Sequence, residues 1–194
     1  MLTPHLETPR VRFSPIAPEN VTKLYDLLTE LGLESLPSRD AFSESYHSVA
    51  KRFVDIFEIQ LRRTGEVLGF GSIREHDPAG HVKLGIFMRT NRLPVGVGAE
   101  SMMLLVNHAF ANWDYLRKVY VLTTDASLGQ FGSALLSTPR EASLPRHVYF
   151  QGRLWDLHFY SVSRSAWTAN GAPILDRIAR GPRSRAAAGG SRPE

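Results

Sequence analysis

A strand–loop–helix–strand unit in the middle of the chain constrains the fold most. The run Val82–Met88 predicts a strand, and the strongly apolar stretch Ala99–Trp113 predicts a helix. A β-rich run follows at Lys118–Leu122. We therefore expect a crossover helix between two strands, which belongs to a mixed α/β (α+β) domain.

The first half of the chain predicts a short strand, two helices and a hairpin. Apolar residues at helical spacing from Val21 to Leu31 predict a first helix, and Ser38 is a suitable N-cap for a second one, which carries apolar residues from Ala41 to Phe53. The expected strands of this half are Val11–Phe13, Val54–Leu61 and Val67–Arg74.

The second half continues with weaker signals. Ser127–Ser137 predicts a short helical segment that Pro139 ends, and Ser165–Ile178 predicts a C-terminal helix or loop. Two more strands are expected at about His147–Phe150 and Leu154–Val162.

The length of 194 residues indicates one domain, which we place at residues 1–180. Residues 181–194 have no periodic apolar face, so we expect a disordered basic tail. The chain has no cysteine, which excludes disulfide scaffolds, thiolate metal sites and cysteine nucleophiles. No run of 18 apolar residues occurs, and we expect a cytoplasmic protein without a membrane partner. A net charge of +4 does not require a nucleic-acid partner.

The loop that opens the central helix has the chemistry of a phosphate cradle. Gly96 and Gly98 allow close approach of the backbone, and the start of a helix presents unpaired N–H groups with partial positive charge. Arg89 and Arg92 add charged donors. An ordinary connection whose glycines serve only the turn explains the loop equally well. Ser101 replaces the third glycine of a dinucleotide fingerprint, and no Walker loop occurs.

Five segments of the chain show a family pattern: the opening VRFSPIAPENVTKLYDLL, the hairpin GEVLGFGSI, the unit KLGIFM…GVGAESMMLLVNHAF, the strand LRKVYVLT and the ending LPRHVYFQGRLWDLHFYSVSRSAW. Together they span roughly Val11–Trp167. In them the chain resembles the GCN5-related N-acetyltransferases, in the branch that acetylates ribosomal-protein N-termini and related amines. The loop departs from the family motif because its arginine lies four residues before Gly96 instead of three.

The resemblance implies a mixed, mostly antiparallel sheet with one splayed strand and flanking helices. It implies acetyl-CoA as cosubstrate, no metal, an amine acceptor and room for a homodimer. The splayed strand would bind the pantetheine arm through Ile86, Phe87 and Met88. Arg92 and the amides of five residues would hold the diphosphate: Val95, Gly96, Val97, Gly98 and Ala99. An N–H near Phe87 or Met88 would polarise the thioester carbonyl.

The chain differs from the branch at the catalytic positions. Lys83 stands where a strand carboxylate is common, and it is charged at neutral pH. By alternation His81 shares its face, so His81 is a candidate base; an exposed residue at the start of a strand is the simpler interpretation. Ser133 falls at the position of the acid tyrosine, and Ala126 at that of an asparagine. An N-cap or surface role explains Ser133 equally well.

Other polar residues have competing interpretations. His147, Asp156 and His158 suggest a metal site. Only Asp156 and His158 share one strand face, and spacing places no third ligand beside them, so we expect no metal. His108 is expected to pack or cap a helix. By resemblance, Glu34, Glu44 and Tyr46 would border the acceptor site, while a solvated helix face explains the two acids equally well.

The sequence thus predicts an acetyl-CoA-dependent N-acetyltransferase that acts on a primary amine of a protein N-terminus or a small molecule. The alternative is a non-catalytic acyl-CoA-binding protein on the same fold, because the usual catalytic side chains are replaced.

Overall fold

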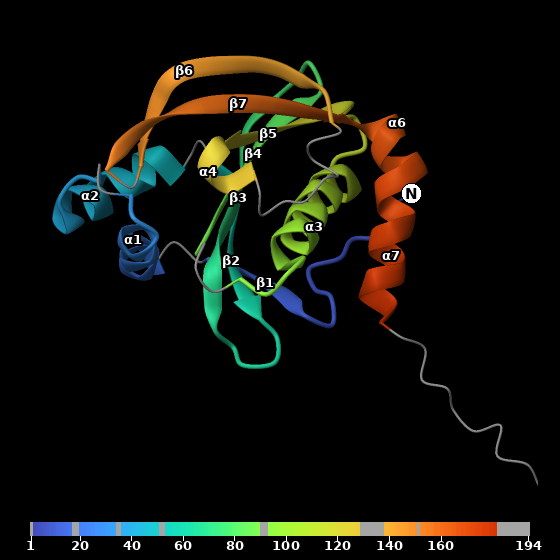
Figure 1. The fold of residues 1–194 in the computed structure, drawn as a ribbon, viewed down its shortest axis with the longest axis horizontal. Helices are drawn as coiled ribbons and strands as arrows, with labels where there is room; N and C mark the ends of the chain where they lie inside the picture. Colours follow the sequence, from blue (N-terminus) through green and yellow to red (C-terminus); the bar gives the residue numbers. More distant parts are fainter. Residues whose placement is uncertain are drawn as a thin grey trace, which may run out of the picture.

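A computed structural model describes residues 2–16, 20–33, 36–50, 53–89, 93–128, 138–150 and 152–181. Its centre is a seven-stranded sheet in the order β1-β2-β3-β4-β5-β7-β6 (Figure 1). The strands are β1 (Val11–Pro15), β2 (Phe53–Leu61), β3 (Val67–Asp77), β4 (His81–Met88), β5 (Lys118–Thr124), β6 (Arg140–Phe150) and β7 (Arg153–Ser163).

All neighbouring strands are antiparallel except β4 and β5, which are parallel. The helix between these two strands is α3 (Val97–Asn112), so the expected crossover unit is confirmed. Parallel neighbours need such a long connection, which explains why this unit could be recognised from the sequence. The expected mixed, mostly antiparallel sheet is also confirmed.

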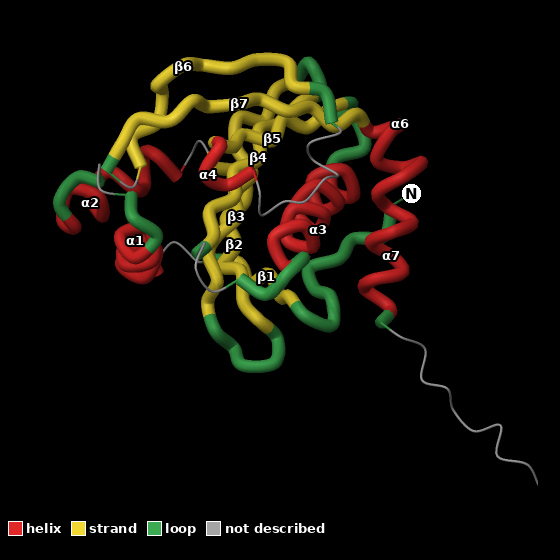
Figure 2. Tube along the Cα trace, viewed as in Figure 1, coloured by secondary structure: helices red, strands yellow, loops and turns green. Residues whose placement is uncertain are grey.

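Helices cover both faces of the sheet (Figure 2). One side carries α1 (Val21–Glu30) and α2 (Arg39–Ala50), and the other carries α3. The remaining helical elements are α4 (Asp125–Leu128), α6 (Arg164–Ala166), the π-helical turn η2 (Trp167–Gly171) and α7 (Ala172–Arg180). Ser38 caps α2 as expected, because its Oγ accepts from the Ala41 amide at 3.3 Å.

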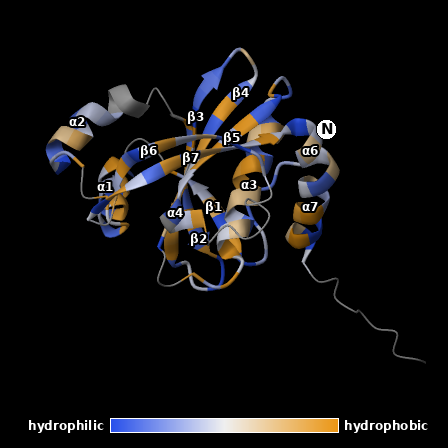
Figure 3. Ribbon diagram, turned by 45° about the horizontal axis from the view of Figure 1, so that its top comes forward, coloured by the Kyte–Doolittle hydropathy of each residue, from blue (hydrophilic) through white to orange (hydrophobic). Residues whose placement is uncertain are grey.

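Two apolar cores lie on the two faces. The larger one packs strand residues such as Leu84 and Val121 against α3, where Leu104 and Phe110 are fully buried. The smaller one packs Phe70 under residues of α1 and α2. Figure 3 shows the orange, hydrophobic residues along α3 and the central strands. Burial of these side chains is the main force that holds the layers together.

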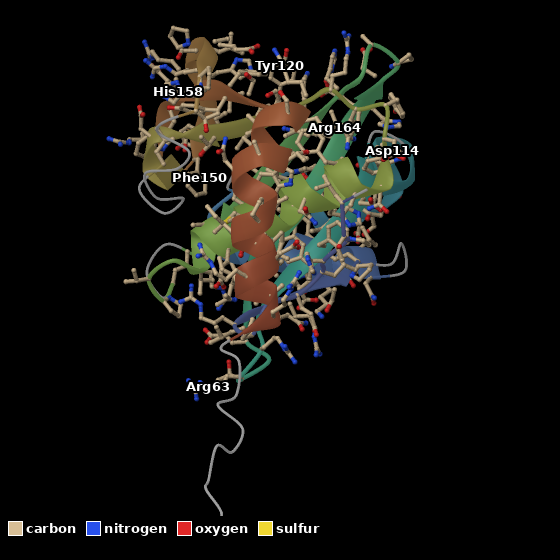
Figure 4. The ribbon with its side chains drawn as sticks, turned by 90° about the vertical axis from the view of Figure 1, so that its right-hand side faces the viewer. Arg63, Asp114, Tyr120, Phe150, His158 and Arg164 are labelled. Carbon is tan, nitrogen blue, oxygen red and sulfur yellow. The ribbon has the colours of Figure 1, made fainter. Side chains whose placement is uncertain are left out.

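The C-terminal segment is fastened to α3 and to the start of β5. Arg164 lies over the Phe110 ring at 5.0 Å and donates to the Leu116 carbonyl at 2.6 Å (Figure 4). The Trp167 indole donates to Asn107 Oδ1 at 3.2 Å and is buried. The arginine and tryptophan at the end of the resemblance are therefore structural residues.

Two boundaries differ from the sequence-based expectations. Phe53 begins β2 and does not belong to the second helix. β6 begins at Arg140, although Pro145 lies within it. The strand tolerates this proline because β6 is the edge of the sheet, and its register against β7 shifts between Leu144 and Val148. Most of the expected helix at Ser127–Ser137 and the tail from residue 182 lie outside the described residues.

Candidate functional site

The sheet opens between β4 and β5 at one end. The paired residues run from His81 opposite Lys118 to Gly85 opposite Leu122. Beyond this point, within the described part of the chain, Ile86–Met88 pair only with β3, and Thr123–Thr124 pair only with β7. The two strands therefore leave a gap between β4 and β5, into which each presents an unpaired edge.

Backbone geometry decides which β4 groups face the gap. The Arg89 amide donates to the Leu68 carbonyl at 2.8 Å, so it points toward β3. Since successive residues of a strand alternate, the N–H and C=O groups of Met88 and Ile86 point into the gap, and those of Phe87 point toward β3. The packing at Gly69 on β3 supports this orientation. A Cβ on Gly69 would lie 2.1 Å from the Phe87 carbonyl oxygen, so that oxygen points toward β3.

The loop after β4 leads directly into the start of α3. Gly96 has a φ of 83°, a conformation that favours glycine, and Val95 is 94% exposed. The Val97 amide donates to the Pro94 carbonyl at 3.1 Å. Among the described residues, the amides of four neighbours have no acceptor: Val95, Gly96, Gly98 and Ala99. The loop thus offers four of the five donors expected from the sequence.

Arg10, which precedes β1, adds a cation to this loop. Its Nε donates to both carboxylate oxygens of Glu100 at 3.1 and 3.2 Å, and its Nη1 donates to the Val95 carbonyl at 2.9 Å. Its Nη2 lies 3.0 Å from the position that a Cβ of Gly96 would occupy. Glu100 is itself buried and also accepts from Thr8. No sequence motif signalled Arg10, because it lies 86 residues before Gly96 and only the fold joins them.

The residues expected to bind cosubstrate come together, and the candidate base does not join them. Ile86 and Met88 turn their backbone groups into the gap, Phe87 lies between them and turns its groups toward β3, and Val95–Ala99 form the loop beside the gap. His81 lies at the paired end of β4, four residues from Gly85, which is about 13 Å at 3.3 Å per residue. Its ring packs against Tyr120 at 5.6 Å. Arg92 and Ser133 lie outside the described residues.

A second polar group lies beside the gap and was not recognised as such from the sequence. His158 on β7 is the register partner of Thr123, the first β5 residue beyond the paired segment. Its Nε2 lies 3.0 Å from Asp125 Oδ1 at the start of α4, and its Nδ1 lies 2.8 Å from Ser143 Oγ on β6. The imidazole is buried, and Figure 4 labels its position. Chain spacing alone paired His158 with Asp156, whose Oδ1 instead accepts from the Arg146 amide at 2.9 Å.

A cavity of about 210 Å³ lies between α1 and the sheet. Arg89 lines it, and Arg89 directly follows Met88 at the gap. Glu58 reaches the cavity from β2 with a side chain that is 7% exposed. Lys23 Nζ donates to Glu58 Oε2 at 2.7 Å, and Oε1 has no hydrogen-bond partner among the described residues. This pairing was not expected from the sequence.

The expected acceptor border is only partly described. Tyr46 is buried in the smaller core, and this burial raises the pKa of its phenol above the usual value. It therefore stays neutral at physiological pH. Glu34 lies outside the described residues.

His108 packs as expected and has a charged partner. Its Nε2 lies 3.0 Å from Asp55 Oδ2, and its ring meets Phe57 edge-on at 4.9 Å. Lys83 is paired with Glu75. Among the described residues, no group of three His, Asp or Glu side chains could hold a metal ion. No helix in the described part of the chain is long and apolar enough to cross a membrane.

Comparisons of sequence give no relatives: no protein-family model matches the chain, and no curated protein has a matching sequence.

Comparisons of structure give many matches to solved proteins. Mutant forms of the spermidine/spermine N-acetyltransferase SpeG from Vibrio cholerae match with a TM-score of 0.65 and 12% identity, over 82% of this chain and 97% of that one. A GCN5-related N-acetyltransferase from Brucella melitensis matches with a TM-score of 0.59 and 17% identity, over 88% and 83%. A candidate ribosomal-protein-serine acetyltransferase from Vibrio cholerae matches with a TM-score of 0.56 and 15% identity, over 81% and 96%.

Proposed function

We propose that this chain, which has the fold of the GCN5-related N-acetyltransferases, transfers an acetyl group from acetyl-CoA to a primary amine. The observation that carries the proposal is the loss of pairing between β4 and β5 beyond Gly85 and Leu122, next to the glycine loop of α3. The extended pantetheine arm of acetyl-CoA fits such a gap because it can form hydrogen bonds with the free edge of a strand.

The diphosphate of acetyl-CoA would lie at the start of α3. Four amides that have no acceptor among the described residues, together with the guanidinium of Arg10, supply donors there. Glu100 holds that guanidinium in place, so its position does not depend on a ligand. Charge-assisted bonds of this kind are the stronger ones in proteins. Arg92 would add a second cation, as the resemblance implies.

The reaction would be direct attack of a neutral amine on the thioester carbonyl. The Met88 N–H faces the gap and would stabilise the oxyanion. This assignment refines the expectation of an N–H near Phe87 or Met88. The nitrogen would lose its proton to water or a base, the C–S bond would break, and the CoA thiolate would take up a proton.

Calorimetry with CoA and a thiol-release assay with acetyl-CoA test the proposal. We expect CoA to bind and thiol to be released with at least one acceptor from a panel of N-terminal peptides, simple amines and polyamines. Absence of CoA binding would refute the proposal. CoA binding without turnover on any acceptor would favour a non-catalytic acyl-CoA-binding protein, which the pairing of Lys83 with Glu75 also allows.

The catalytic roles expected for His81 and Ser133 are tested by His81→Gln and Ser133→Ala in the same assay. A fall in kcat with unchanged CoA affinity would support either role. An unchanged kcat would exclude it.

A further inference from the structure

Glu58 carries an acceptor atom that the described fold does not use. Its side chain is 93% buried and lines the cavity beside α1, while Oε1 is shielded from solvent and has no partner among the described residues. Asp26 and Glu30 also line the cavity, and each is already paired with an arginine, Arg39 and Arg89 respectively. Leaving a buried carboxylate oxygen unbonded is costly, so the Glu58 carboxylate favours a cationic partner that donates hydrogen bonds.

Lys23 shows which kind of group fits there. Its ammonium lies 2.7 Å from Glu58 Oε2, yet the Lys23 side chain is 60% exposed and extends from the surface of α1. An ammonium therefore already occupies one side of the carboxylate. A ligand ammonium would replace Lys23 on this carboxylate, so the two cations compete for the same negative charge.

The cavity lies beside the proposed reaction centre. Glu58 is the register partner of Phe70, and Phe70 is the register partner of Phe87 at the gap. Neighbouring strands are about 4.8 Å apart, so two strand spacings place Glu58 about 10 Å from Phe87 along the sheet. Arg89 lies at both the cavity and the gap, because it lines the cavity and directly follows Met88 in the chain.

We propose that Glu58 forms a subsite for a second cationic group of the acceptor, so that the chain prefers amines with two ammonium groups separated by a long spacer. This inference rests on the proposed function, because the reacting amine is placed at the gap between β4 and β5. Lys23 then occupies the subsite until the acceptor arrives.

The test compares diaminooctane with octylamine and with diaminopropane by calorimetry, in the presence of saturating CoA. We expect the wild-type chain to bind diaminooctane about tenfold more tightly than either comparison amine, the gain expected for one charged hydrogen bond. Glu58→Gln should remove this preference. Lys23→Gln should strengthen diaminooctane binding severalfold, because it removes the competing cation.

Glu7→Gln is the matched control, since Glu7 is an exposed carboxylate paired with Arg12 and does not line the cavity. It should leave all three affinities unchanged. Equal binding of diaminooctane and octylamine by the wild-type chain would overturn the subsite, as would weaker diaminooctane binding by Lys23→Gln. If Glu58→Gln does not fold, Lys23→Gln alone still tests the subsite.

The outcomes separate this inference from the proposed function. Diamine binding with the expected variant pattern but without thiol release from acetyl-CoA would leave the subsite standing and refute the transfer reaction. Thiol release with monoamines and diamines at equal efficiency, together with equal affinities, would uphold the transfer reaction and overturn the subsite.

Discussion

His158 Nε2 lies 3.0 Å from Asp125 Oδ1, and this contact joins β7 to the start of α4 beside the gap. On the other side of the ring, His158 Nδ1 lies 2.8 Å from Ser143 Oγ on the edge strand β6. Three separate elements therefore meet at one buried imidazole.

We expect His158→Ala to destabilise the fold by about 2–3 kcal/mol, because it removes two hydrogen bonds and leaves a cavity. Chemical denaturation measures this loss. His147→Ala is the control, since His147 is exposed on β6 and should change stability by less than about 0.5 kcal/mol. Equal effects of the two replacements would show that the imidazole contacts add nothing to stability.

Gly96→Ala should weaken CoA binding. Alanine at a φ of 83° costs about 1–2 kcal/mol, and the new Cβ would lie 3.0 Å from Arg10 Nη2. Gly65→Ala provides the matched control, because Gly65 has a φ of 72° and open space around it. Both variants should lose similar stability, and only Gly96→Ala should raise the Kd for CoA, by about tenfold. Unchanged CoA affinity in Gly96→Ala would contradict the proposed diphosphate site.

Arg10→Gln should affect both stability and CoA binding. The replacement leaves the buried Glu100 carboxylate without its cation, and Arg10 is 44% exposed, so we expect a loss of about 2 kcal/mol. Arg12→Gln is the control, because Arg12 pairs with the exposed Glu7. Calorimetry should show weaker binding of CoA and unchanged binding of pantetheine, which lacks the diphosphate. Equal weakening for both ligands would argue for a general distortion of the gap.

The buried Tyr46 should lower the free energy of unfolding at alkaline pH. Burial raises the pKa of its phenol above the ordinary value of 10.0, so the unfolded chain releases the proton at a lower pH than the folded one. The contribution of Tyr46 is complete below pH 10 and declines as pH rises from 10 through the folded-state pKa. Tyr46→Phe should remove this part of the pH dependence, and Tyr149→Phe, at an exposed tyrosine, should not. Identical alkaline profiles of wild type and Tyr46→Phe would refute the assignment.

Local patterns predicted much of the fold, because each of those elements carries its own signal. The crossover unit from Val82 to Leu122 was expected and confirmed, since apolar periodicity and a glycine loop mark it directly. The position of Phe53 was wrong, because an apolar residue at the end of a helical pattern is also a suitable first residue of a strand. The start of β6 was missed, because an exposed edge strand with a proline has no apolar alternation to recognise.

In the candidate site, too, the features that depend on local sequence could be predicted and the long-range contacts could not. Backbone donors of the loop after β4 could be expected from Gly96 and Gly98, because they depend on local conformation. Arg10 with Glu100, and Lys23 with Glu58, could not, because these pairs are 90 and 35 residues apart in the chain. Long-range ion pairs depend on strand order and register, which no local pattern contains.

The proline and the register shift in β6 have a consequence for the protein at high concentration. An outermost strand normally offers a continuous row of backbone donors and acceptors, onto which another molecule can add and start aggregation. Pro145 has no N–H, and the irregularity between Leu144 and Val148 bends the row out of line. The open side of the sheet is thereby a poor template for fibril growth.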